Sequence, residues 1–124
     1  MGPFADDWTQ ADVEAVLARG DPSELLYVPI VVGMNADQCE REWAEAICFR
    51  LARHPDFNVR GNAILGLGHI ARTCRALNTG TAVPLISQAL ADPHEYVRGH
   101  AADTSSDLLI YLNVRVPEPG SPRA

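Results

Sequence analysis

The sequence predicts an all-α protein, a short solenoid of about five or six helices. The first observation behind this prediction is the segment 59–74, where apolar side chains recur at steps of three and four and so line one side of a helix. The second is that the same pattern returns 38 residues later, at 97–112. The third is that Gly61, Gly66 and Gly68 interrupt the first copy. Each glycine weakens an isolated helix by about 1 kcal/mol relative to alanine, so we expect a neighbouring helix to approach closely there.

Both copies carry an inner apolar stripe. The stripe of the first copy consists of Val59, Ala63, Leu67, Ile70 and Cys74. The stripe of the second copy consists of Val97, Ala101, Ser105, Leu108 and Leu112. A repeat of about 40 residues is typical of helix pairs stacked into an α-solenoid, so we expect one pair over about residues 36–74 and another over about residues 83–112.

The second copy resembles a HEAT repeat. The resemblance rests on Pro84-Leu85-Ile86, Ala89-Leu90-x-Asp92 and Val97-Arg98-x-x-Ala101-Ala102. Together with the first copy it covers about residues 38–112. In that family a proline starts or bends the first helix, an aspartate lies in the turn, and an arginine opens the second helix. The resemblance implies that the two charges form a ladder between neighbouring repeats.

Three residues are therefore expected in a structural ladder: Asp92, Arg60 and Arg98. Asp92 and Arg98 match the family by position in the second copy. In the first copy Arg60 is present, but His54 stands in place of the aspartate and Ala46 in place of the proline. We expect the ladder to be incomplete there. A resemblance of fold implies no particular activity.

The N-terminal part is expected to be helical as well. Residues 1–8 are expected to form a loose arm whose aromatic side chains can fold back. Thr9 and Asp12 have the spacing of a capping box, which predicts a helix that starts there and ends at Gly20. The dipeptide 21–22 is Asp-Pro and predicts the start of a further element, because proline is tolerated in a first helical turn.

The apolar stretch 25–32 is rich in β-branched residues and contains Pro29. A strand and a short buried helix kinked at Pro29 both fit this pattern, and the all-helical surroundings favour the helix. Asn35 then has the side chain to cap a long helix over about residues 36–53.

The rest of the chain follows the repeat. Residues 54–58 form the turn into the core helix, and the second pair is expected over about residues 83–90 and 96–112. Residues 114–124 contain three prolines and a glycine, which predicts a disordered tail. The expected organisation is one domain over residues 1–113.

No catalytic, cofactor-binding or metal-binding residue is assigned, and no cofactor is expected. His94, His100 and Asp103 lack a recognised metal-ligand spacing. Cys74 lies on the inner stripe, which favours a structural thiol over a nucleophile. The glycines of segment 59–74 are not followed by the Gly-Lys-Ser/Thr of a phosphate-binding loop. We therefore expect a protein that is not an enzyme.

Charge is distributed unevenly along the chain. Residues 1–45 hold ten acidic residues and two arginines, a net charge of −8, whereas residues 46–124 have a net charge of +2. The sequence contains no lysine and no basic stripe with aromatic residues, so direct binding to DNA or RNA is not expected. An acidic surface instead attracts a basic protein partner and speeds its association.

Five acids are candidate partner-binding residues: Glu40, Glu42, Glu45, Asp103 and Asp107. The last two replace Leu65 and His69 of the first copy. They fit either a polar outer cap on the terminal repeat or a patch for the partner, and the cap is favoured because the last unit of a solenoid needs a polar outer surface.

Composition indicates the compartment. The three cysteines show no Cys-x-x-Cys spacing, and the sequence contains no signal peptide and no apolar run of about 18 residues. These features predict a soluble cytoplasmic protein with no membrane association. Arginine without lysine, together with abundant alanine and glycine, favours a bacterial gene rich in G and C.

The segment Val-Arg-Gly-Asn-Ala-Ile-Leu-Gly-Leu-Gly-His-Ile-Ala, residues 59–71, resembles HEAT-related immunity proteins of bacterial toxin/immunity systems of the contact-dependent growth inhibition type. The resemblance implies a non-enzymatic protein that binds and neutralises a toxin, such as a nuclease domain. One alternative is a HEAT-like scaffold or regulatory subunit without a toxin partner. A third is a small enzyme whose site has no recognised motif.

Overall fold

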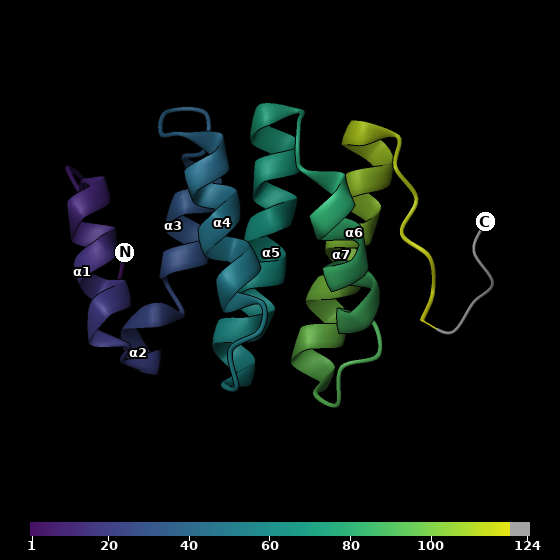
Figure 1. The fold of residues 1–124 in the computed structure, drawn as a ribbon, viewed down its shortest axis with the longest axis horizontal. Helices are drawn as coiled ribbons and strands as arrows, with labels where there is room; N and C mark the ends of the chain where they lie inside the picture. Colours follow the sequence, from purple (N-terminus) through teal and green to yellow (C-terminus); the bar gives the residue numbers. More distant parts are fainter. Residues whose placement is uncertain (120–124) are drawn as a thin grey trace.

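A computed structural model describes residues 1–119 and shows helices joined by short loops, with no strand in that range (Figure 1). Seven helical segments follow one another: α1 (Gln10–Arg19), α2 (Pro22–Leu25), α3 (Val28–Met34), α4 (Arg41–Leu51), α5 (Phe57–Cys74), α6 (Thr79–Ala89) and α7 (Glu95–Leu112). The predicted fold class, a short α-solenoid, is confirmed. None of the helices within residues 1–119 is both long enough and apolar enough to cross a lipid bilayer.

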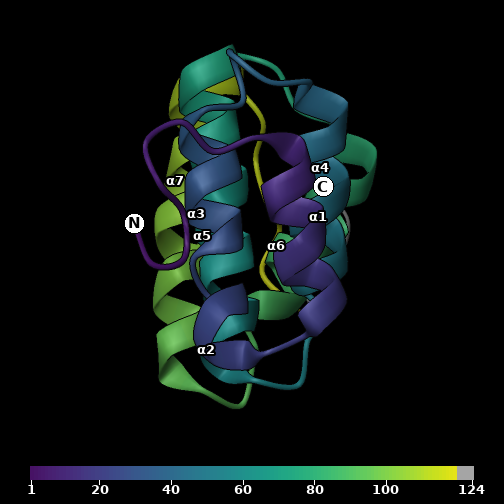
Figure 2. The same ribbon diagram turned by 90° about the vertical axis from the view of Figure 1, so that its left-hand side faces the viewer.

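The helices form two layers. Figure 2 shows α1, α4 and α6 in one layer and α3, α5 and α7 in the other. Within the second layer α3 packs against α5, and α5 packs against α7. Consecutive pairs therefore stack in a row, as Figure 1 shows. The segment α1–α3 supplies a further unit, the first in the row, which the 38-residue repeat does not reveal.

The first unit is built from local signals. The capping box is confirmed, since Thr9 and Asp12 bond reciprocally at the start of α1, and Gly20 ends that helix in the left-handed conformation with φ 68°. Asp21 accepts a hydrogen bond from the backbone of Ser23 and starts α2. Pro29, expected to kink a helix, instead lies in the first turn of α3, where its missing N–H leaves no hydrogen bond unmade.

The fourth helix starts later than predicted. It begins at Arg41 rather than near Ala36, and residues 35–40 form an irregular loop. The reason is that Asn35 ends α3: its side-chain Nδ2 donates to the backbone oxygen of Val31 at 2.8 Å. The same residue therefore does not cap the next helix, and α4 starts only after Glu40.

The fifth helix is the centre of the core. Asp56 caps it by accepting hydrogen bonds from the backbone of Asn58 and Val59. The inner stripe lies where the periodicity places it, with Val59, Ala63, Leu67 and Ile70 fully buried and Cys74 half-buried. Because α5 packs against α4 and α6 of the first layer as well as against α3 and α7, it joins the two layers.

The glycines of α5 mark the sites of close approach. A Cβ atom on Gly66 would lie 2.7 Å from the backbone oxygen of Pro29 and 2.9 Å from Sγ of Cys48. A Cβ atom on Gly68 would lie 2.7 Å from a carboxylate oxygen of Asp107. The close approach predicted from the three glycines is therefore confirmed: α3 and α7 both approach α5 closely.

Polar side chains join the helices of the second layer. Thr104 is fully buried, and its hydroxyl donates to the backbone oxygen of Ile64 at 3.0 Å. The sequence pattern places Ser105 in this stripe, but Ser105 is only half-buried. Thr104 can be buried because the Ile64 carbonyl satisfies its hydroxyl. Near the start of α7, the Tyr96 hydroxyl donates to Oδ1 of Asn62 on α5. Nδ2 of Asn62 in turn donates to the backbone oxygen of Leu26 at 2.8 Å.

Irregular segments cover parts of the two ends of the row. In the N-terminal arm, Phe4 is 5% exposed and packs edge-on against Trp8, so the arm is docked. At the other end, Val116 joins the hydrophobic core and the Ser87 hydroxyl donates to the backbone oxygen of Pro117 at 2.7 Å. The prediction of a disordered tail is therefore wrong for residues 114–119, because Val116 has apolar surface to bury; the remainder of that prediction lies outside the described residues.

Candidate functional site

The expected ladder residues meet at the contact between the second and third helix pairs. Nε and Nη2 of Arg60 donate to the Asp92 carboxylate at 2.7 and 2.9 Å, a two-pronged ion pair. The side chains are only 19% and 10% exposed. Hydrogen bonding from Arg60 lowers the pKa of Asp92, and the same contact raises the pKa of the guanidinium. The pair therefore joins neighbouring repeats.

The two arginines have a shared local role. Arg98 donates to the backbone oxygen of Asp92 at 2.7 Å, and Arg60 donates to the backbone oxygen of His54 at 3.1 Å. The two turns also match: the Asp92 carboxylate accepts from the backbone N–H of His94, and Nδ1 of His54 accepts from that of Asp56. His54 thus supplies the turn's hydrogen bond without supplying a carboxylate, which explains how the first copy tolerates the departure from the family pattern.

Replacing the carboxylate tests the ladder. We expect Asp92→Asn to lower the free energy of unfolding by about 2 kcal/mol at pH 7, since it removes a charge-assisted hydrogen bond that is mostly shielded from water. Because folding lowers the pKa of Asp92, its contribution is complete above the unfolded pKa of about 3.9 and is lost as the pH falls through the lower, folded pKa.

Urea unfolding of both proteins at pH 7 and at progressively lower pH measures this effect. The difference between wild type and Asp92→Asn should shrink on acidification. A difference that stays constant across this range would contradict a role for the carboxylate charge.

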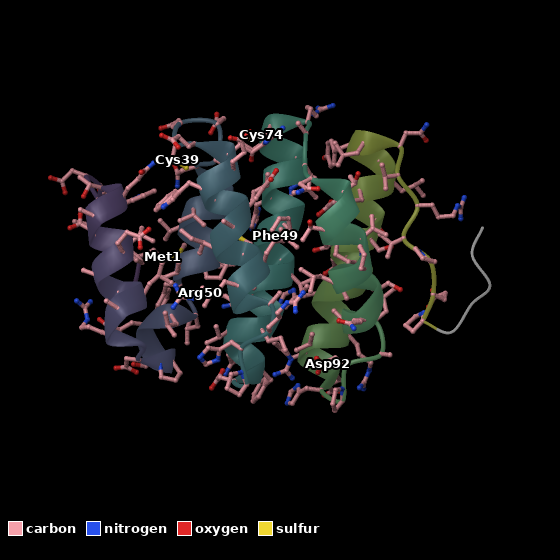
Figure 3. All side chains as sticks on the ribbon, viewed as in Figure 1. Met1, Cys39, Phe49, Arg50, Cys74 and Asp92 are labelled. Carbon is pink, nitrogen blue, oxygen red and sulfur yellow. The ribbon has the colours of Figure 1, made fainter. Side chains whose placement is uncertain are left out.

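An acidic rim lies at the end of the molecule away from the ladder. It consists of Asp37, Glu40 and Glu42, all exposed, in the loop 35–40 and the first turn of α4. The side chain of Glu42 is 86% exposed. Figure 3 shows Cys39 and Cys74 at this end and Asp92 at the opposite end.

Two hollows adjoin the acidic rim. The larger, of about 580 Å³, is lined by Ala36, Asp37, Cys39, Glu40, Arg41, Glu42, Thr73 and Cys74. The smaller, of about 300 Å³, is lined by Asp6, Trp8, Thr9, Gln10, Asn35, Gln38 and Cys39. Cys39 belongs to both, so the hollows are neighbours. Asp6, Trp8 and Asp37 were not among the candidates from the sequence, although the excess of acids in residues 1–45 pointed to this region.

Glu45 does not belong to the exposed rim, in contrast to the expectation. It is 3% exposed, and its carboxylate forms an ion pair with Nε of Arg41 at 3.2 Å and accepts a hydrogen bond from the backbone N–H of Asn78 at 3.1 Å. The second bond ties α4 to the loop before α6. Glu45 therefore holds the repeat together, and a partner cannot reach its carboxylate without disturbing the fold.

Asp107 is likewise used inside the protein. Its carboxylate accepts from Nη1 of Arg72 at 2.7 Å, and only 13% of its side chain is exposed. Nη2 of Arg72 also contacts Nδ1 of His69, so the three side chains form one network between α5 and α7. Asp103 is exposed on α7. The expected pair of acids is thus split, and of the five candidates only Glu40, Glu42 and Asp103 present exposed side chains.

The cysteines are poorly suited to nucleophilic chemistry. Burial raises the pKa of all three thiols, Cys39, Cys48 and Cys74, above the usual value, so they are protonated at neutral pH. Within the part of the chain that the structure describes, no three His, Cys, Asp or Glu side chains come together in a way that could hold a metal ion.

Comparison with protein families identifies HEAT repeats over residues 44–114. This region spans most of α4 and all of α5, α6 and α7, so it contains the Arg60–Asp92 ladder. Comparison with curated proteins and with solved structures gives no match.

Proposed function

Because the chain belongs to the HEAT-repeat family, whose repeats cover more than half of it, we propose that it is a protein-binding module and that the acidic rim is its docking site. HEAT repeats often mediate protein interactions. The observation that carries the choice of surface is the exposure of Asp37, Glu40 and Glu42 beside a hollow of about 580 Å³. Exposed charges beside this shallow, open hollow give a partner charge and some shape to match.

The partner that fits this surface is basic. Residues 1–45 carry a net charge of −8, and most of the positive charge of the chain lies elsewhere. Arginine and lysine side chains on a partner would be drawn to such a field and oriented by it. Arg41, near the rim, has part of its charge neutralised by the buried carboxylate of Glu45.

In its finer form the proposal is that the chain is an immunity protein, which binds a bacterial toxin domain in the cytoplasm and blocks it without catalysing a reaction. A nuclease toxin domain is a suitable partner, because nucleases carry basic surfaces for their substrate. Support comes from the acidic rim and from the resemblance of residues 59–71 to HEAT-related immunity proteins. No metal or cofactor is invoked in this role.

The second candidate is a scaffold or regulatory subunit with no toxin partner. The observation that favours it is the family match itself, because HEAT repeats serve many interactions that involve no toxin. The two candidates differ in whether the gene next to this one encodes a toxin against which the protein protects cells. Expression of that neighbouring gene with and without this protein separates them.

Charge reversal at the rim tests the docking site. For Glu40→Lys combined with Glu42→Lys we expect association with the basic partner to slow about tenfold at low salt, and the loss to fade at high salt, because rim charges act mainly on the association rate. Binding kinetics at two salt concentrations and protection of toxin-expressing cells are the measurements. Both side chains are exposed, so the fold should be kept, with only a small fall in melting temperature because two positive charges replace acids at the N-terminus of α4.

The matched control reverses two exposed acids away from the rim, Asp103 and Glu118, with the same change of net charge. This control variant should retain fast association. If it loses binding while the rim variant keeps it, α7 is the docking surface instead. If neither variant slows association, the acidic surface has no part in binding.

A further inference from the structure

The last helix carries a free face. The uncharged exposed residues of α7 define its outer face: Gly99, Ala102, Ser106, Leu109 and Ile110; the charged residues Glu95, Arg98 and Asp103 are exposed along the same helix. Leu109 is 45% exposed and Ile110 is 70% exposed, which is unusual for large apolar side chains in this molecule. Small residues occupy the first half of the face and bulky apolar residues the second half. We call the first half of this face, with its small residues, the slot, and the bulky second half the ridge.

The internal repeat shows what such a face does. The 38-residue repeat places Gly99 at the position of Gly61 and Ser106 at that of Gly68. In α5 these positions contact the next helix: Gly61 lies beneath the Tyr96 ring, and Gly68 lies against Thr104 and Asp107 of α7. At Gly99, by contrast, a Cβ atom would have no neighbour within 4 Å. The outer face of α7 thus repeats a helix-packing face to which no helix within residues 1–119 is added.

We propose that this face packs against the same face of a second copy of the chain, with the two α7 helices antiparallel across a twofold axis. In that orientation the ridge of each copy meets the slot of the other. Antiparallel packing places Ile110 of one copy over Gly99 of the other, and brings Asp103 of one copy beside Ser106 of the other. Parallel packing would set ridge against ridge and slot against slot, which leaves voids.

Charge supports the same arrangement. Glu95 begins α7, and Arg115 follows its end; both side chains are exposed. In the antiparallel pair each glutamate comes near the arginine of the other copy, so the twofold axis gives two such contacts. The other end of the solenoid offers a poorer partner, because its arm is docked and the exposed surface of α1 carries Asp12 and Glu14. Head-to-tail stacking there would also leave an open chain rather than a closed dimer.

The mass of the full chain in solution tests the proposal. We expect light scattering after size exclusion to show a dimer in the high micromolar range, and Ile110→Glu to weaken dimerisation at least about tenfold by placing a charge in the contact. The control is Met34→Glu, since Met34 is also a half-exposed apolar residue, on α3. The control should keep the wild-type mass. A wild-type protein that stays monomeric at these concentrations, or an Ile110→Glu protein that dimerises normally, would overturn the proposal.

Three further substitutions separate the contact from folding and test its orientation. Gly99→Gln has space in the monomer but fills the slot, so it should also reduce the dimer while the helical circular dichroism is unchanged. Glu95→Arg and Arg115→Glu should each weaken the dimer, and their combination should restore it. Weakening by each change without restoration by both would exclude the antiparallel arrangement.

Discussion

Leu67→Asp should leave the protein unfolded at room temperature. Leu67 is fully buried near the middle of α5. The substitution removes a large apolar side chain from the core and places an unpaired carboxylate there. We expect a loss of about 5 kcal/mol or more, which is comparable with the whole stability of a small domain. Circular dichroism and a thermal melt measure the result.

The matched control is the same substitution at a half-exposed leucine. Leu109→Asp, on the outer face of α7, should lower the free energy of unfolding of the monomer by less than about 1 kcal/mol, because its carboxylate remains in water. The control is measured at low protein concentration, where self-association has no effect. A cooperative melt of Leu67→Asp within a few degrees of wild type would contradict the assignment of the inner stripe to the core.

Gly66→Ala should lower the free energy of unfolding by about 2–3 kcal/mol, although alanine is the better helix former. The added methyl group would lie 2.7 Å from the backbone oxygen of Pro29, and backbone cannot move aside as the end of a flexible side chain can. We expect α3 to be pushed away from α5. Urea unfolding measures the change, and the position of α3 can be followed by chemical shifts.

Gly99→Ala, at a helical glycine with open space around it, should change the free energy of unfolding in the opposite direction. No atom lies within 4 Å of the new Cβ, so the gain in helix propensity should stabilise the monomer by up to about 1 kcal/mol. The two variants make the same chemical change and differ in what surrounds the glycine. If Gly66→Ala were also stabilising, close packing of α3 on α5 would be wrong.

The buried faces of the second and third helix pairs could be predicted because their signals are local, although the starts of α4 and α6 could not. The spacing of Val59, Ala63 and Leu67 fixes which side of α5 is buried, and the glycines among them indicate close neighbours. Asp92 and Arg60 could be expected near one another because the family pattern repeats at this position. In each case the information lies within one helix or one repeat.

The rest depends on contacts between distant segments, which spacing does not encode. The first unit lacks the 38-residue repeat, so its place in the stack could not be predicted. The structure shows it, with Gly33 of α3 packed closely against Gly66 of α5. The sequence suggests that Glu45 and Asp107 are surface acids. In the structure the backbone of Asn78 donates to Glu45, and the guanidinium of Arg72 donates to Asp107. At the acidic rim the acids could be anticipated from charge, but the hollow they border could not, because it forms between a loop and the end of α5.

The central position of α5 has a consequence for how the protein opens. Among the helices of residues 1–119, α5 packs against α3 and α4 on one side of the row and against α6 and α7 on the other. Backbone amides in the middle of α5 can therefore exchange with solvent only when both neighbouring units separate from it, which amounts to global unfolding. Amides of α1, at one end of the row, need only local fraying. Hydrogen exchange should therefore slow steadily from α1 to α5, and the slowest amides should report the stability of the whole chain.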